Sequence, residues 1–278
     1  MTWWCSASGQ PWTWAWKAYP GVWLFVSFLL LGYMLARRAT PAPLQPPARR
    51  PGWVLGGVFT VWLALDWPIG ALGAGYLASL HAASWVMLSL IAPPLFLLGW
   101  PSASLERCAR APFLGPILRA AAHPLIAFVV FSTLLVATHL PTVVDGAMRS
   151  QMGALLIDLA WFGGGLVLWW PVLSPQPAVG RLSRPLKMGY LFLTTLPPIL
   201  PAAFLIFSDY PLYAVYELAP RVVGLTARED QQLAGLIMKL IGDLPLWLAF
   251  GIIFFRWARE DQAPGPSPPL ASAGASSS

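Results

Sequence analysis

Charged residues are scarce in this chain, and their scarcity excludes a water-soluble globular protein. They make up 10% of the 278 residues, whereas 57% of the residues are hydrophobic. A soluble domain carries about 25% charged residues, which keep its surface hydrated. The composition therefore predicts a membrane protein that has the lipid bilayer as its main partner.

Cysteine is also nearly absent, with Cys5 and Cys108 the only two in the chain. We expect them on opposite sides of the membrane, and neither belongs to a CxxC pair. The sequence thus indicates neither a disulfide framework nor a thiolate metal site. The excess of 17 basic over 11 acidic residues does not indicate a nucleic-acid partner, because the basic residues form short clusters between apolar runs.

Long apolar stretches recur along the chain. A helix needs about 20 mainly apolar residues to cross a bilayer, so we predict an all-α, polytopic membrane helical bundle with about seven transmembrane helices. Asp66-Trp67-Pro68 interrupts the second stretch, and Pro197-Pro198 predicts a kink in the sixth. The predicted spans are Tyr19–Ala36, Trp53–Gly73, Ser79–Leu98, Pro124–His139, Met152–Val172, Met188–Phe207 and Gln232–Phe255.

Basic residues are distributed unevenly between the two predicted sides of the membrane. If the N-terminus lies outside, 12 of the 17 basic residues fall in the inner loops and tail. The positive-inside rule then predicts an outer N-terminus and a cytoplasmic C-terminus. We expect residues 1–261 to form a single seven-span domain. Residues 262–278, composed mostly of Pro, Ser, Ala and Gly, are predicted to be a disordered cytoplasmic tail.

Ionisable residues inside a span are costly in lipid and usually have a function. Asp158, Lys239 and Asp243 are such residues, and the last two can pair because they lie four residues apart on one helix. We expect an Asp158–Lys239–Asp243 network in the outer leaflet. The simplest role of this network is that its opposite charges neutralise one another between helices. A proton relay is the alternative, but the inner halves of these spans lack the continuous polar series that a proton path needs.

Histidine offers the candidate metal ligands. His81 lies near the outer end of the third span, and His139 ends the fourth on the same side, so the two can be partners. His123 precedes Pro124 and is interpreted as a helix-start residue. Methionine thioethers suit Cu(I), but the methionines are scattered, and we interpret them as ordinary residues of apolar helices.

The loop between spans six and seven is the longest predicted outer connection. It contains Asp209 and Tyr213. Thr226 is well placed as the N-cap of the last span, with Glu229 as its capping-box partner. The polar run that follows is either a solvated first helical turn or a polar surface over a site at the outer face; it consists of Asp230, Gln231 and Gln232.

Several of these segments together resemble the polytopic CtaG family of cytochrome c oxidase assembly factors. The resemblance implies a non-enzymatic assembly factor for a haem–copper oxidase in the bacterial inner membrane, with oxidase subunits as partners and copper as the candidate cargo. The segments occur in family order and follow His81; they are Ile91-Ala92-Pro93-Pro94-Leu95, His139-Leu140-Pro141, Gly165–Val172, Pro211–Tyr216 and Glu229–Met238.

The chain also departs from the family pattern, which implies a second histidine four residues after His81, where this chain has Trp85. The histidines expected in span five correspond here to Ala154 and Asp158. One histidine, an aspartate and a tryptophan make a poor copper site. We therefore expect this member to keep the scaffold and to have lost most of its metal affinity.

Two other functions stay open. A stable, non-catalytic accessory subunit of a larger membrane complex would use its Trp- and Gly-rich helix faces for packing. Gly163-Gly164-Gly165 would permit close helix approach. A transporter or channel for copper or protons would fit the proline-broken helices. The absence of a polar path through the membrane counts against this second alternative.

Overall fold

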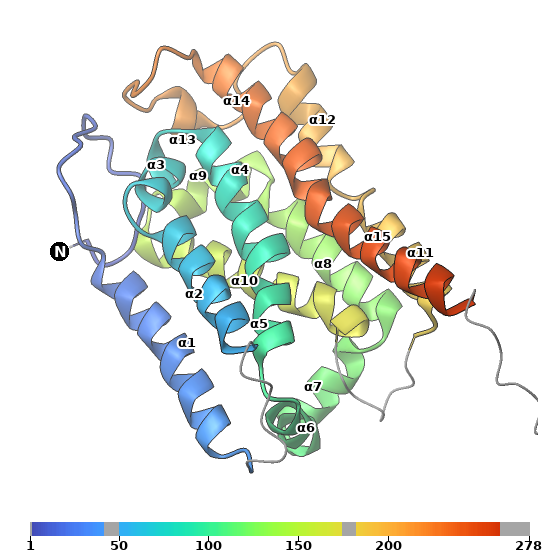
Figure 1. Ribbon diagram of the computed structural model, residues 1–278. Coiled ribbons are helices and arrows are strands. Elements are labelled where there is room, and N and C mark those ends of the chain that lie inside the picture. The colour runs from blue at the N-terminus through green and yellow to red at the C-terminus, as the bar shows by residue number, and fades with distance from the viewer. Residues whose placement is uncertain (1, 42–49, 174–181, 262–278) are drawn as a thin grey trace, which may run out of the picture.

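The computed structural model describes residues 2–41, 50–173 and 182–261, and the described residues form helices and connecting segments with no strand among them (Figure 1). Helices satisfy every backbone hydrogen bond within one segment, which lipid requires. The predicted all-α class is confirmed. The predicted tail, residues 262–278, lies outside the described residues.

Five helical segments are long and apolar enough to cross a membrane, and two bent helix pairs raise the number to as many as seven. The predicted membrane bundle is therefore confirmed. The five segments are α1 (Pro20–Arg38), α4–η2–α5 (Ala78–Gly99), α10 (Gln151–Leu173), α11–α12 (Arg184–Phe207) and α14–η3–α15 (Ala227–Asp261). The bent pairs are α2 (Arg50–Leu65) with α3 (Ile69–Gly75), at 44°, and α7 (Leu114–Ala121) with α8 (Pro124–Thr138), at 92°.

Proline sets several of the helix ends. It occupies the first helical positions of α1, α8, α11 (Arg184–Thr194) and the short α9 (Pro141–Met148), where its missing N–H costs nothing. Pro197 and Pro198 separate α11 from α12 (Ile199–Phe207), at the predicted interruption. The remaining short connecting helices are α6 (Ser102–Arg110) and α13 (Ala214–Glu217).

Two spans contain a π-helical turn that the sequence did not predict. In the first, η2 (Met87–Ile91) joins α4 (Ala78–Val86) to α5 (Ala92–Gly99). In the second, η3 (Ile237–Ile241) joins α14 (Ala227–Leu236) to α15 (Gly242–Asp261). A π-turn is rare and is found frequently at functional sites. Here η2 packs against α10 and η3 packs against α4, so each turn lies at a contact between two spans.

The two ends of the bundle differ in character (Figure 1). At one end, which we call the histidine end, the starts of α4 and α14 meet α3, α9 and α13. At the other, which we call the arginine end, the last turn of α1 meets α6, and α6 packs against α7. Its arginines are Arg37, Arg38, Arg107, Arg110 and Arg119. The orientation with the arginine end inside the cell stays a prediction.

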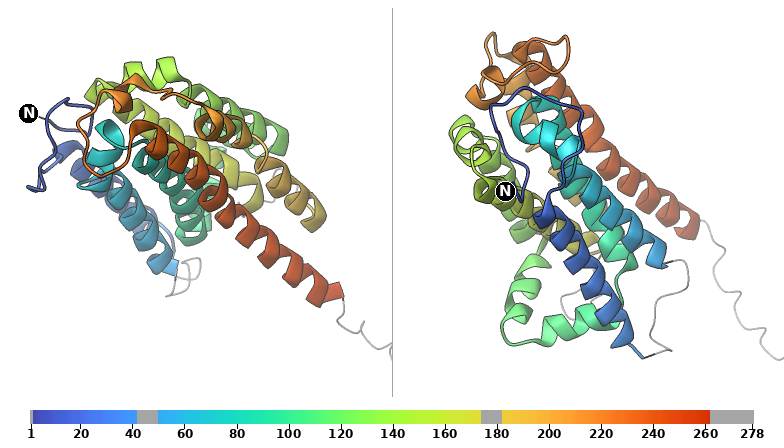
Figure 2. Two further views of the ribbon diagram at one scale, coloured as in Figure 1. Left: turned by 90° about the horizontal axis from the view of Figure 1, so that it is seen from above. Right: turned by 90° about the vertical axis from the view of Figure 1, so that its left-hand side faces the viewer.

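The N-terminal segment, residues 2–19, folds back over the histidine end beside α3 and the start of α1 (Figure 2). The backbone N–H groups of Trp3 and Trp4 both donate to Gln151 Oε1, at 2.6 and 3.1 Å. The Ala7 N–H donates to the Met148 carbonyl at 2.8 Å. These bonds attach the segment to the start of α10 and the end of α9.

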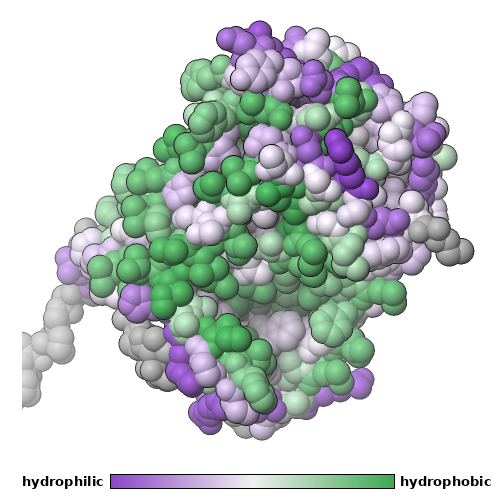
Figure 3. All heavy atoms as spheres, turned by 180° about the vertical axis from the view of Figure 1, so that it is seen from behind, coloured by the Kyte–Doolittle hydropathy of each residue, from purple (hydrophilic) through white to green (hydrophobic). Residues whose placement is uncertain are grey.

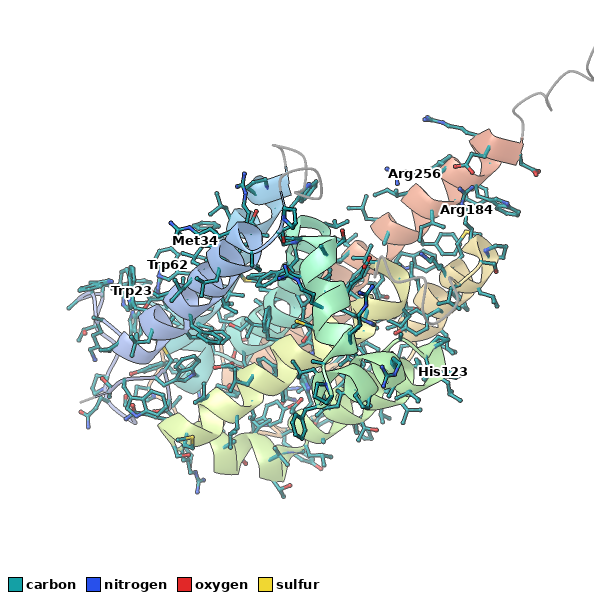
Figure 4. All side chains as sticks on the ribbon, turned by 90° about the horizontal axis from the view of Figure 1, so that it is seen from below. Trp23, Met34, Trp62, His123, Arg184 and Arg256 are labelled. Atoms are coloured by element: carbon teal, nitrogen blue, oxygen red, sulfur yellow. The ribbon has the colours of Figure 1, made fainter. Side chains whose placement is uncertain are left out.

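The outer sides of the helices are apolar, as lipid contact requires. Trp23 of α1 packs edge-on against Trp62 of α2, with 5.9 Å between ring centroids, and Met34 lies further along the same side (Figure 4). Arg184 and Arg256 lie across the bundle from them, on α11 and α15 (Figure 4). A water-soluble monomer does not expose so extensive an apolar surface.

Candidate functional site

His81 is buried near the start of α4, with 5% of its surface exposed. Its ring lies 4.7 Å from the Trp161 ring and 5.7 Å from the Tyr216 ring, measured between centroids. Its Nε2 atom is buried and has no hydrogen-bond partner among the residues that the structure describes. A buried, unpartnered ring nitrogen is an uncommon arrangement, because burial without a hydrogen bond is costly. His81 is therefore a candidate ligand.

His139 follows the end of α8 and is equally buried, at 6% exposure. Its Nδ1 lies 2.8 Å from the Leu135 carbonyl, which can only accept, so Nδ1 carries the proton. The Nε2 atom then carries the free lone pair, and it too is buried without a partner in the described part of the chain. An imidazole oriented in this way by a backbone carbonyl is typical of metal ligands.

Aromatic rings enclose the two histidines. The His81 and His139 ring centroids are 6.3 Å apart. Trp161 stacks on His139 at 5.7 Å, and Trp85 lies 5.6 Å from His139. Trp161 also donates from Nε1 to the Thr138 hydroxyl at 2.9 Å, which fixes the indole. The structure thus brings the two predicted ligands together and packs aromatic rings against them.

The described residues contain no group of three or more His, Cys, Asp or Glu side chains arranged to hold a metal ion. Two imidazole nitrogens alone are a small donor set for copper. Among the described residues, the imidazole donors at this site are therefore His81 and His139.

A small cavity of about 20 Å³ lies beside His81. Such a volume holds about one water molecule. Its wall includes Cys5, Met148, Ala154 and Asp158. Ala154 and Asp158 are the positions of α10 at which the family resemblance implies histidines. The structure therefore places both around one cavity with His81.

Asp158 does not join Lys239 and Asp243. Its Oδ2 atom accepts from Trp4 Nε1 at 2.8 Å, and no hydrogen bond or ion pair links it to either residue in the described structure. The expected three-residue network is therefore divided into two separate sites. The sequence reasoning considered only residues within the spans as partners for Asp158, whereas the buried Trp4 of the N-terminal segment supplies the partner.

Lys239 and Asp243 form the expected i, i+4 ion pair, with 2.6 Å between Nζ and Oδ2. Lys239 also donates to the Thr195 carbonyl at 3.0 Å. That carbonyl lies at the break between α11 and α12, where the helix cannot supply a backbone partner. The ion pair thus links the η3 turn to the break between α11 and α12. This geometry indicates a role in helix packing.

Asp230 caps α4 from a different helix. Its carboxylate accepts from the Ala78 N–H at 2.6 Å, and from the Ser79 N–H and hydroxyl. This places the start of α14 against the helix that carries His81. The predicted capping box is also present, with Thr226 and Glu229 exchanging hydrogen bonds. Asp230 is therefore neither solvated nor part of an open polar surface.

The other residues predicted in this region hold the loop between α12 and α14. Gln231 accepts from the Leu212 N–H at 2.6 Å and donates to the Leu205 carbonyl at 3.2 Å. Gln232 donates to the Ile206 carbonyl at 3.1 Å. Tyr213 donates to the His139 carbonyl at 2.9 Å. Asp209 is exposed and pairs with Arg228 at 3.0 Å.

Two residues that sequence reasoning missed complete this end of the molecule. Tyr216 donates to the Gly73 carbonyl at 2.6 Å, and burial raises the pKa of its phenol well above the usual value, so it stays a donor. Asp145 caps α13 by accepting from the Ala214 and Val215 N–H groups at 3.2 and 2.9 Å. Tyr216 lies in Pro211–Tyr216, one of the segments that resemble the family, so the sequence offered a signal for it. Nothing in the sequence pointed to Asp145 as a capping residue.

The comparison with known proteins agrees with this arrangement. A family model described as cytochrome c oxidase caa3 assembly factor (Caa3_CtaG) matches residues 26–260. No curated protein and no solved structure matches the chain. The matched range includes His81, His139, Asp158 and the loop that closes over them. Because it covers most of the sequence, the chain belongs to the cytochrome c oxidase caa3 assembly factor family.

Proposed function

We propose that this protein is a non-enzymatic, membrane-embedded assembly factor that assists the maturation of the copper centre of a haem–copper oxidase. The observation that carries the proposal is the buried histidine pair, which lies in a chain of an oxidase assembly factor family. We place it in the bacterial inner membrane, where an oxidase subunit would be its transient partner.

The proposal includes a loss of metal affinity. His81 and His139 offer two free imidazole nitrogens, whereas Ala154 and Asp158 occupy positions at which further histidines are expected. Asp158 is also engaged by Trp4. Copper held by two nitrogens would exchange readily with other ligands. With so little copper affinity, the main role of the protein would be to guide or stabilise the oxidase subunit, not to store copper.

Copper retention tests the metal part of the proposal. We expect the purified full-length protein, loaded with Cu(I) and dialysed, to keep well under one ion per chain, and His81→Ala to change this little. His123→Ala is the matched control, because His123 is exposed at the start of α8. Atomic absorption gives the copper content. Stoichiometric copper that His81→Ala removes and His123→Ala leaves would contradict the loss of affinity.

Copurification and a gene deletion test the assembly part. We expect deletion to lower the amount of copper-loaded oxidase, and re-expression of the native chain to restore it. The protein should copurify with an oxidase subunit only during oxidase synthesis. A fixed-stoichiometry complex with no effect of deletion on oxidase copper would instead identify an accessory subunit. The packing of Cys5 and Trp161 beside His81 favours this second function.

A further inference from the structure

A second, larger cavity lies near the arginine end, separate from the histidines. Its volume is about 260 Å³, and it opens between α1, α5, α7 and α10. Every lining residue is apolar, including Leu29, Phe96, Leu118 and Trp170. Figure 3 shows the molecule hollowed toward its lower end, with hydrophobic atoms around the hollow and hydrophilic atoms below it. The cavity offers no group to bind a polar molecule, so its occupant must present an apolar chain.

Arginines lie on two of the helices that line this cavity. Leu105 of α6 and Leu118 of α7 line it, and Arg107 and Arg119 follow on the same helices. Arg107 donates to the Ala39 carbonyl at 3.0 Å, and Arg119 donates to the Ala109 carbonyl at 3.2 Å. These bonds join α1, α6 and α7, and both arginines are exposed at the arginine end.

The charge at this end is almost entirely positive. Within α1, α6 and α7 there are five arginines and one acidic residue, Glu106, which gives a net charge of 5 − 1 = +4. Glu106 pairs with Arg110 at 3.6 Å. Arg37 and Arg38 lie in the last turn of α1. An anion at the arginine end would therefore meet uncompensated positive charge.

We propose that this cavity holds an acyl chain of an anionic phospholipid, with the phosphate of its headgroup facing the arginines of the arginine end. An apolar wall alone would not select a lipid, because lipid tails are as apolar as leucine side chains. The selection comes from the headgroup, since guanidinium groups bind phosphate well and basic pockets at a membrane surface bind anionic lipids.

Native mass spectrometry of the full-length protein tests this site. The protein is purified in mild detergent and equilibrated with phosphatidylglycerol or phosphatidylcholine of the same chain length. We expect one retained phosphatidylglycerol per chain, at about tenfold preference over phosphatidylcholine. The double variant R37Q/R38Q should lose this preference. R149Q should keep it, because Arg149 is exposed at the histidine end, between α9 and α10.

Filling the cavity tests where the acyl chain lies. A121W and the milder V167F should both reduce retention of phosphatidylglycerol severalfold without removing a charge. L156W is the matched control, because Leu156 is exposed on α10 away from the cavity. Circular dichroism verifies that each variant is folded. Equal retention of the two lipids by the native chain, or unchanged retention in folded V167F, would overturn the proposal.

Discussion

Gly165→Ala should destabilise the protein by about 3 kcal/mol, near the upper end of the cost of overpacking a core. A Cβ atom at this position would lie 2.3 Å from the Ser89 carbonyl oxygen and 2.6 Å from Pro93 Cγ. A backbone oxygen in the η2 turn cannot rotate away, so α10 must separate from η2 and α5. The loss would appear as a lower midpoint of chemical unfolding in detergent, followed by tryptophan fluorescence.

Gly163→Ala is the matched control, because it makes the same change two residues earlier in the same helix. No heavy atom lies within 4 Å of its added Cβ atom. Alanine favours helix by about 1 kcal/mol over glycine, so this variant should be neutral or slightly stabilised. Equal stability of the two variants would mean that α10 and η2 are not in close contact.

Asp230→Ala should cost about 3 kcal/mol, because the change leaves buried donors without an acceptor. The carboxylate holds the Ala78 and Ser79 N–H groups and the Ser79 hydroxyl at the start of α4. Without it, the first turn of the helix that carries His81 would loosen. Chemical unfolding measures the stability, and amide hydrogen exchange at residues 78–81 locates the change.

Two further variants test whether the lost cap on α4 causes the destabilisation in Asp230→Ala. Asp230→Asn keeps one acceptor oxygen and should lose less stability than alanine. Asp209→Ala removes an exposed carboxylate whose side chain is 89% accessible, so it should change the unfolding midpoint little. If Asp230→Ala and Asp209→Ala behaved alike, the cap on α4 would contribute nothing to the fold.

Local features of the fold could be predicted from the sequence because each has a short-range physical cause. Apolar length predicted the spans, and Pro197-Pro198 predicted the break between α11 and α12. The Thr226–Glu229 capping box and the Lys239–Asp243 pair depend only on residues three or four positions apart on one helix.

Long-range partners could not be predicted in the same way. Asp158 finds its partner in Trp4, which is 154 positions away, and Asp230 caps α4 across 152 positions. The π-turns also left no periodic signal, although each adds a residue to a helical turn and rotates the residues that follow. The histidine site was therefore predicted as a pair of side chains, whereas its enclosure by Trp161 and Tyr216 was not.

The N-terminal segment has a consequence for the timing of events at the histidine end. Cys5 lies in the wall of the cavity beside His81 and donates to the Leu65 carbonyl at 3.1 Å, while Trp4 is bound to Asp158. Anything that reaches His81 from this side must wait until these bonds open. Local opening of a packed segment takes microseconds to seconds. The opening rate of this segment would then limit how fast a ligand can reach or leave His81 from this side.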